Sequence, residues 1–156
     1  MDRGRQRFLQ HPRRLQAYKL VWGQMEAQHY APISLADVSH YIRQHPNDER
    51  SAFRVCLEFL DEYRAEPRAA RARLLEPKPP PTTSRRWDAF LGALAEHLAF
   101  HDRLPVPDWA QKPDRFLDSS WFLLDLPSVK PSAIAESPAA FRRRAIWITA
   151  EALDRV

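Results

Sequence analysis

Two histidines near the middle of the chain have the residue type and spacing best suited to chemistry. His97 and His101 lie four residues apart, and Glu96 precedes the first of them. On a helix this spacing places both imidazoles on one face, where they could share a metal ion. The third ligand that a metal site needs would come from His29, His40 or Asp108. A packed structural histidine, with one ring nitrogen bonded to a backbone carbonyl, is the favoured interpretation of His97.

A run of three arginines, Arg142, Arg143 and Arg144, is the second candidate site. Guanidinium groups bind phosphate well, so the run could hold a phosphorylated ligand or nucleic acid. Successive side chains on a helix point in different directions, however, and a short charged run is usually a solvated surface. We therefore expect these arginines to face solvent, with one of them paired to Asp125 or Glu136.

Basic residues are concentrated at the start of the chain. The whole sequence has a formal net charge of +4, from 24 Lys and Arg against 20 Asp and Glu. The first twenty residues alone hold six basic residues and one acidic residue, a difference of +5. The candidate partner-binding arginines there are Arg3, Arg5, Arg7, Arg13 and Arg14. A basic arm on a nearly neutral body predicts an acidic partner, either nucleic acid or protein, with a solubilising tail as the alternative.

Motifs of familiar enzyme classes are missing from the sequence. It contains no hydrolase nucleophile elbow, no glycine-rich phosphate loop and no zinc-protease helix. Cys56 lies between Val55 and Leu57 on an apolar helix face, which favours an inert core thiol over a nucleophile. We therefore predict that the protein is not an enzyme and needs no cofactor. A metal-dependent enzyme built on His97 and His101 remains the less favoured alternative.

The surroundings of the protein follow from cysteine usage and hydropathy. A single cysteine permits neither an internal disulfide nor a cysteine-based zinc site. No apolar run approaches the length of a membrane span, and the basic start is not followed by the apolar core of a signal peptide. We therefore expect a cytoplasmic protein without a membrane partner.

The candidate histidines belong to the clearest predicted helix, residues 86–101, with Ser84 as its cap. Apolar residues recur at intervals of three and four residues and should form one buried stripe. They are Trp87, Phe90, Leu91, Leu94 and Leu98. Further helices are predicted over 13–28, after a capping box formed by Ser34 and Asp37, and after Asn47. Ser137 and Pro138 should begin a short helix, which places the arginine run on it.

An all-α fold with little or no strand is the overall expectation. Fourteen prolines against three glycines favour helices joined by proline-containing loops over a sheet with tight hairpins. The apolar run 121–124 should be buried, and 146–148 is β-prone. Four tryptophans should form the core of the second half: Trp87, Trp109, Trp121 and Trp147.

Four regions follow from these patterns. We predict a flexible basic arm over 1–12, a helical region over 13–76, a Pro-rich linker over 77–83 and a Trp-rich helical domain over 84–156. The linker should be extended and fairly stiff. Whether the two halves pack as one unit stays open.

The second half resembles a family of small bacterial proteins. The shared segments run in order through the chain: RWDAFL from Arg86, AEHLA from Ala95, LPVPDW from Leu104, Arg115–Leu117, Trp121–Phe122, and SPAAFRRRAIWI from Ser137. The upstream stretch Val55–Arg64 is similar to the leader that often precedes them. Members of this family often carry an XRE-type helix-turn-helix at the N-terminus. They look like antitoxin partners of nucleotidyltransferase-like toxins, or like small transcriptional regulators.

The resemblance implies a non-enzymatic protein-interaction component, an antitoxin that binds and neutralises the toxin encoded by an adjacent gene. The chain departs from the family pattern at its front, because residues 13–45 offer two helices but no clear recognition helix. The alternative is a small nucleic-acid-binding regulator that uses the basic arm. A homo-oligomer is compatible with either function.

Overall fold

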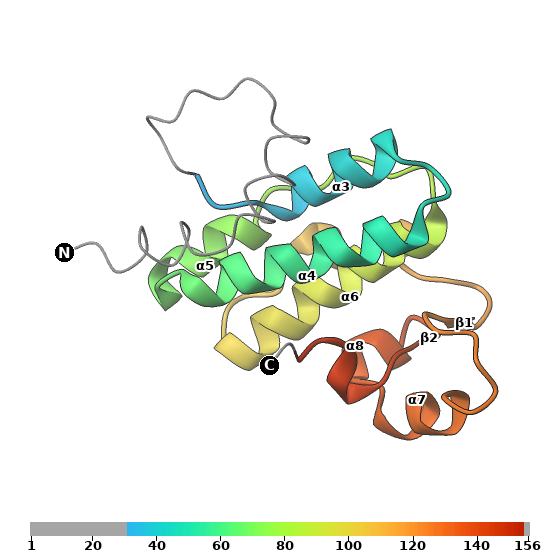
Figure 1. Cartoon of the computed structure of the whole chain (residues 1–156). Helices are drawn as coiled ribbons and strands as arrows, with labels where there is room; N and C mark the ends of the chain where they lie inside the picture. The colour runs from blue at the N-terminus through green and yellow to red at the C-terminus, as the bar shows by residue number, and fades with distance from the viewer. Residues whose placement is uncertain (1–30, 155–156) are drawn as a thin grey trace, which may run out of the picture. The chain divides into compact units, whose positions relative to one another are not determined.

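The computed structural model describes residues 31–154, and helices dominate them (Figure 1). The elements follow in the order α3 (Leu35–Gln44), α4 (Glu49–Ala65), α5 (Arg68–Leu75), α6 (Arg85–Asp102), η1 (Asp108–Gln111), η2 (Pro113–Arg115), β1 (Trp121–Phe122), α7 (Lys130–Glu136), α8 (Ala139–Arg142), β2 (Ile146–Trp147) and η3 (Ala150–Ala152), where η denotes a 3₁₀ helix. The prediction of a mostly α fold is confirmed. The predicted arm over 1–12 and helix over 13–28 lie outside the described residues.

Local side-chain caps begin α3 and α6, as the sequence predicted. In α3 the backbone N–H of Asp37 donates to Ser34 Oγ (3.3 Å), while the backbone N–H of Ser34 donates to the Asp37 carboxylate (2.8 Å). The predicted capping box is therefore confirmed. Ser34 has its counterpart in Ser84, whose Oγ accepts from the Trp87 N–H at the start of α6. Helix α4 begins one residue later than predicted, because Asp48 caps it while Asn47 takes a left-handed turn conformation with φ 68°.

Helix α6 lies at the centre of the described residues. Its predicted stripe, Trp87 to Leu98, is buried. The small residues around that stripe are buried as well: Ala89, Gly92, Ala93, Ala95 and Ala99. Helices α3, α5 and α8 and the turns η1 and η2 all contact α6, so the prediction of one buried face was too narrow. Small side chains on the remaining surface of α6 let these segments approach it closely.

Aromatic rings fill the space between α6 and the segments that follow it. The ring centroid of Trp87 lies 5.3 Å from that of Trp121, and the centroid of Phe90 lies 5.1 Å from that of Phe141. Edge-to-face pairs at these separations stabilise a core beyond the area that they bury. Trp87, Trp109 and Trp121 are buried as predicted, whereas Trp147 is half-buried.

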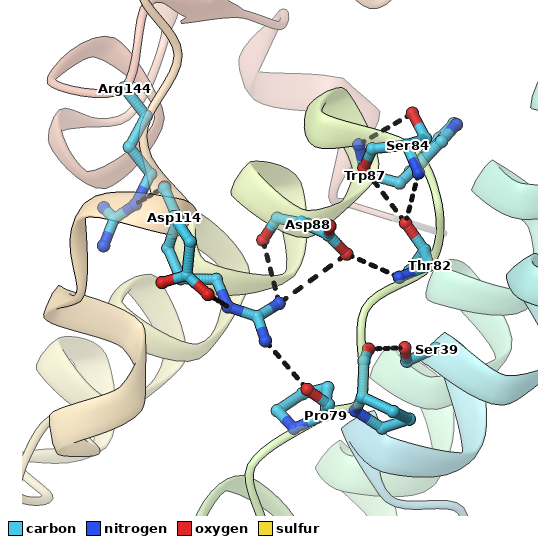
Figure 2. Close-up of polar contacts among 10 residues, drawn as sticks. Ser39, Pro79, Thr82, Ser84, Trp87, Asp88, Asp114 and Arg144 are labelled. Atoms are coloured by element: carbon cyan, nitrogen blue, oxygen red, sulfur yellow. Dashed lines mark hydrogen bonds and ion pairs between the residues drawn. The ribbon is translucent and has the colours of Figure 1, made fainter.

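The Pro-rich segment over 77–83 is packed against both halves of the described structure (Figure 2). The carbonyl of Pro79 accepts a hydrogen bond from Arg115 Nη2 at 2.8 Å, and the carbonyl of Pro80 accepts one from Ser39 Oγ. The backbone N–H of Thr82 donates to the Asp88 carboxylate at 2.8 Å. Residues 32–154 belong to one compact unit. The described parts of the two predicted halves are therefore joined by this segment.

A minimal parallel sheet closes the C-terminal part. Trp121 pairs with Ile146 and Phe122 with Trp147, so the β-prone character of 146–148 is confirmed for its first two residues. Ser137 does not cap a helix as predicted, because Pro138 occupies the cap position of α8. Its buried Oγ instead accepts from the Ile148 N–H at 2.8 Å and lies within hydrogen-bond distance of the Ile146 carbonyl. These hydrogen bonds connect β2 and the residue after it to the turn between α7 and α8.

Gly92 allows the close approach of η2 to α6. A Cβ at this position would lie 2.9 Å from the Cβ of Arg115. Alanine is favoured over glycine in a helix by about 1 kcal/mol. The overlap should outweigh this preference, because Arg115 is buried and hydrogen-bonded. We predict that Gly92→Ala lowers the free energy of unfolding by about 1–3 kcal/mol in urea denaturation. An increase in stability would contradict the close approach.

Candidate functional site

Arg144 is part of the protein core. Its side chain is fully buried, and Nη1 lies 2.6 Å from Glu96 Oε2. The remaining donors bond backbone carbonyls, with Nη2 to Ala110 at 2.7 Å, Nη1 to Ala140 at 2.8 Å and Nε to Arg115 at 3.1 Å. The prediction that this arginine faces solvent was wrong. Its hydrogen bonds are made inside the protein, where it has no surface from which to bind phosphate.

The neighbouring arginines lie closer to solvent and are also engaged. Arg143 is about half exposed; it pairs with Glu96 Oε1 at 2.9 Å and donates to Gln111 at 2.9 Å. Arg142 is exposed and donates to the carbonyl of Ser137 at 3.2 Å. Glu96, rather than the predicted Asp125 or Glu136, therefore pairs with the arginine run. Burial lowers the pKa of Arg144, and the hydrogen bond and charge of Glu96 oppose this change.

The histidine pair lies beside this network without forming a metal site among the described residues. The rings of His97 and His101 are 4.3 Å apart between centroids. Burial, followed by the neighbouring charge of His101, lowers the pKa of His97 to about 4, so its imidazole is neutral near pH 7. Within residues 31–154 no three His, Cys, Asp or Glu side chains are grouped to hold a metal ion. His40 and Asp108 thus do not complete the site, and His29 lies outside the described residues.

The five basic arm residues, Arg3, Arg5, Arg7, Arg13 and Arg14, also lie outside the described residues. Their predicted role in partner binding stays a prediction.

A further polar cluster was not predicted from the sequence. The hydroxyl of Tyr63 donates to Asp102 Oδ2 at 2.6 Å, and Arg71 Nη1 binds both carboxylate oxygens at 2.9 and 3.0 Å. Burial raises the pKa of Asp102, but the bonds from Tyr63 and Arg71 outweigh burial, and the pKa lies below its usual value. Burial and the same carboxylate raise the pKa of Tyr63. The cluster joins α4, α5 and the end of α6, and its residues are too far apart in sequence to form a recognisable motif.

The segment from Ser120 to Glu136 carries most of the large hydrophobic side chains that are exposed in the described part of the chain. Within residues 31–154, four large hydrophobic side chains are exposed, and three belong to this segment: Leu124 (54%), Leu126 (53%) and Ile134 (51%). The fourth is Phe100 on α6. The prediction that the run 121–124 is buried holds for Trp121 and fails for Leu124, because only the start of the run faces the aromatic core. We call residues 120–136, which include β1 and α7, the β1–α7 segment (Figure 1).

A cavity of about 410 Å³ opens beside β1. Its walls come from the start of α4, the start of α6 and the β1–α7 segment. The lining residues are Glu49, Arg86, Ser120, Trp121, Phe122, Leu123, Asp125 and Lys130. Two cations lie over aromatic rings there, with the Arg86 guanidinium 5.8 Å from the Trp121 ring centroid and Lys130 Nζ 5.0 Å from that of Phe122. This cavity, called the β1 pocket below, combines charge with flat apolar surface.

Comparisons of the chain with protein-family models, curated proteins and solved structures found no match. The resemblance to the antitoxin-like family therefore remains an expectation from the sequence. None of the helices within residues 31–154 has the length and apolar character needed to cross a membrane.

Removing the charge of Glu96 should destabilise the fold strongly. Glu96→Gln leaves the buried guanidinium of Arg144 without its counter-charge, which typically costs about 3–5 kcal/mol. The matched control is Asp118→Asn, whose carboxylate forms an exposed ion pair with Arg85 and should contribute less than about 1 kcal/mol. Urea denaturation measures both. Equal losses of stability would show that Glu96 is not a buried structural charge.

Protonation of His97 should destabilise the protein as the pH falls. An unfolded histidine binds its proton near pH 6.5, while folded His97 does so only at about pH 4. The stabilisation that neutral His97 gives the folded state is therefore fully present above pH 6.5, and it is lost progressively as the pH falls from about 6.5 to about 4. We predict that His97→Gln flattens the fall in melting temperature between about pH 7 and pH 5. His40→Gln, which changes an exposed histidine on α3, should keep the wild-type profile. If the melting temperature of His97→Gln fell with pH as steeply as that of the wild type, protonation of His97 would not be the cause of the fall.

Proposed function

We propose that this protein is an interaction component that binds another protein through the exposed apolar side chains of the β1–α7 segment. The observation that carries the proposal is the clustering of Leu124, Leu126 and Ile134 within eleven residues of sequence, as positions 124 to 134 span them. Isolated exposed hydrophobic residues are normal on a protein surface, whereas several on one segment favour a binding surface. Covering them with a partner removes apolar area from water.

The structural supports of the segment favour binding as well. At one end, the N–H of Trp121 donates to the Ala145 carbonyl at 2.8 Å; at the other, Ala133 is buried. Between them, the N–H groups of Val129 and Lys130 donate to the Leu126 carbonyl and form the turn into α7. A segment held in this way loses little conformational entropy when a partner binds.

The finer proposal is that the partner is a toxin encoded by an adjacent gene, and that binding blocks its activity. The family resemblance of the second half supports this role. The excess of basic residues in the first twenty positions suits a second contact with an acidic surface. In this proposal the protein is an antitoxin and has no catalytic activity of its own.

Polar substitution of the exposed apolar residues should weaken partner binding without unfolding the protein. We predict that the combined variant Leu124→Ser, Leu126→Ser, Ile134→Ser binds the purified product of the adjacent gene at least about tenfold more weakly, a loss of about 1.4 kcal/mol. Phe100→Ser, which changes the exposed hydrophobic residue outside the segment, is the matched control and should bind normally. Titration calorimetry gives the affinities, and melting curves verify folding.

Growth on co-expression tests the antitoxin role in cells. The wild type and Phe100→Ser should restore growth to cells that express the partner, and the triple variant should not. Normal affinity and rescue by the triple variant would exclude this surface as the binding site.

The runner-up function is a nucleic-acid-binding regulator, which the basic arm favours. In that case duplex DNA would be shifted in a mobility assay, with affinity falling steeply with salt and disappearing on deletion of residues 1–14.

A further inference from the structure

The two-stranded sheet has one closed edge and one open edge. On the outer side of β2, Ser137 Oγ accepts from the Ile148 N–H at 2.8 Å and lies 3.2 Å from the Ile146 carbonyl oxygen. On the outer side of β1, no hydrogen bond from any residue among 31–154 reaches the backbone. An uncovered strand edge presents donors and acceptors with which another chain can pair. The open edge of β1 is therefore the place where this fold can accept a further strand.

Phe122 supplies the free backbone groups of this edge. The N–H of Trp121 donates to the Ala145 carbonyl at 2.8 Å. The N–H of Leu123 donates to the Trp147 carbonyl at 3.1 Å. Because backbone groups alternate in direction along a strand, the N–H and the carbonyl of Phe122 point away from β2. Phe122 thus offers one donor and one acceptor side by side, which is the pair that an added strand uses.

Space for another chain is available beside this edge. The β1 pocket is lined by residues 120–123 and by no residue of β2. It therefore lies along the flank of β1 that β2 leaves free. Further walls come from Glu49 and Arg86, at the starts of α4 and α6. The volume of about 410 Å³ is open space that backbone and side chains of a partner can enter.

The charged residues of the pocket already pair with one another. Arg86 lies 3.8 Å from Glu49, and Lys130 lies 2.6 Å from Asp125. Two cations and two carboxylates carry no net charge, so a strongly acidic or strongly basic segment gains little electrostatic attraction here. Hydrogen bonds to the backbone and apolar contacts must therefore provide the recognition.

Apolar contacts are available immediately after β1. Leu124 and Leu126 are both more than half exposed and follow Phe122 within four residues. Two residues of chain span at most about 7 Å, so Leu124 lies close to the free backbone groups of Phe122. The open edge and the exposed leucines are therefore continuous, and one partner segment can cover both.

We infer that the partner protein adds an extended, apolar segment to the open edge of β1. Its backbone bonds the N–H and the carbonyl of Phe122, and its apolar side chains cover Leu124 and Leu126. This inference rests on the proposed function and adds how the partner binds. A helix could not take this place, because its backbone groups bond one another along the axis and leave none free along its side. The backbone bonds provide affinity, and the side-chain contacts provide specificity.

Proline at position 122 tests the backbone donor. Phe122→Pro removes the outward N–H, which the bonds between β1 and β2 do not use, and proline is tolerated at such edge positions. Phe122→Ala is the matched control, because it removes the same ring and keeps the N–H. In calorimetric titration with the purified product of the adjacent gene, Phe122→Pro should bind at least about tenfold more weakly than Phe122→Ala. Melting curves verify that both variants are folded.

Amide exchange of the wild type tests the same bond without a substitution, and it decides the matter if Phe122→Pro does not fold. When the wild type is saturated with the partner, exchange of the Phe122 amide should slow at least about tenfold, because a hydrogen-bonded amide must open before it exchanges. The amide of Trp121 is the internal reference, since it already donates to Ala145 and should change less.

The outcomes separate this inference from the function on which it rests. Equal affinity of the two folded variants, or a Phe122 amide that the partner leaves unprotected, would show that strand addition is wrong while the exposed leucines still bind the partner. Absence of any binding by the wild type would overturn both proposals. Protection of Phe122 that rises with protein concentration in the absence of the partner would indicate that a second copy of the chain occupies the edge, and it would also overturn the inference.

Discussion

The ion pair between Glu96 and the fully buried Arg144 is the interaction on which the C-terminal part of the fold depends. Moving a guanidinium out of water is costly, so its charge and its donors must be matched inside the protein. The carbonyls that match them belong to η1, η2 and α8, and the carboxylate belongs to α6. All four segments must therefore dock before Arg144 is satisfied. A chain with short helices and long irregular connections gains cooperativity from this requirement.

Arginines fulfil the same role at two other junctions. Arg115, also buried, donates to the carbonyl of Pro79 and lies 3.8 Å from the Asp88 carboxylate, which joins the Pro-rich segment to α6. Arg71 donates to the carbonyls of Glu66 and Arg64 while it binds Asp102. Irregular backbone leaves carbonyls that no ladder satisfies, and a guanidinium with five donors can satisfy several at once. In this protein arginine replaces part of the hydrogen bonding that a larger sheet would provide.

This dependence on distant partners explains which features could be predicted from the sequence. The caps Ser34 and Ser84 act on backbone three residues away, and the Trp87 to Leu98 stripe follows from helix periodicity alone. The burial of Arg144 could not be predicted, because three arginines in a row differ only in what the rest of the chain places around them. Ser137 was assigned to the wrong role for a related reason. Its serine–proline sequence fits a helix start, but β2 supplies better hydrogen-bond partners for its hydroxyl.

The candidate sites also differ in whether their side chains are already bonded to other parts of the protein. The candidate functional residues that the sequence suggests, such as Glu96 and the arginine run, largely form hydrogen bonds and ion pairs within the protein. In the β1–α7 segment the aromatic side chain of Trp121 is engaged in the same way, because it packs against Trp87 and Phe90. Leu123 and Asp125 line the β1 pocket, whereas Leu124 and Leu126 are exposed. Apolar area that a protein partner could cover is therefore left at these leucines.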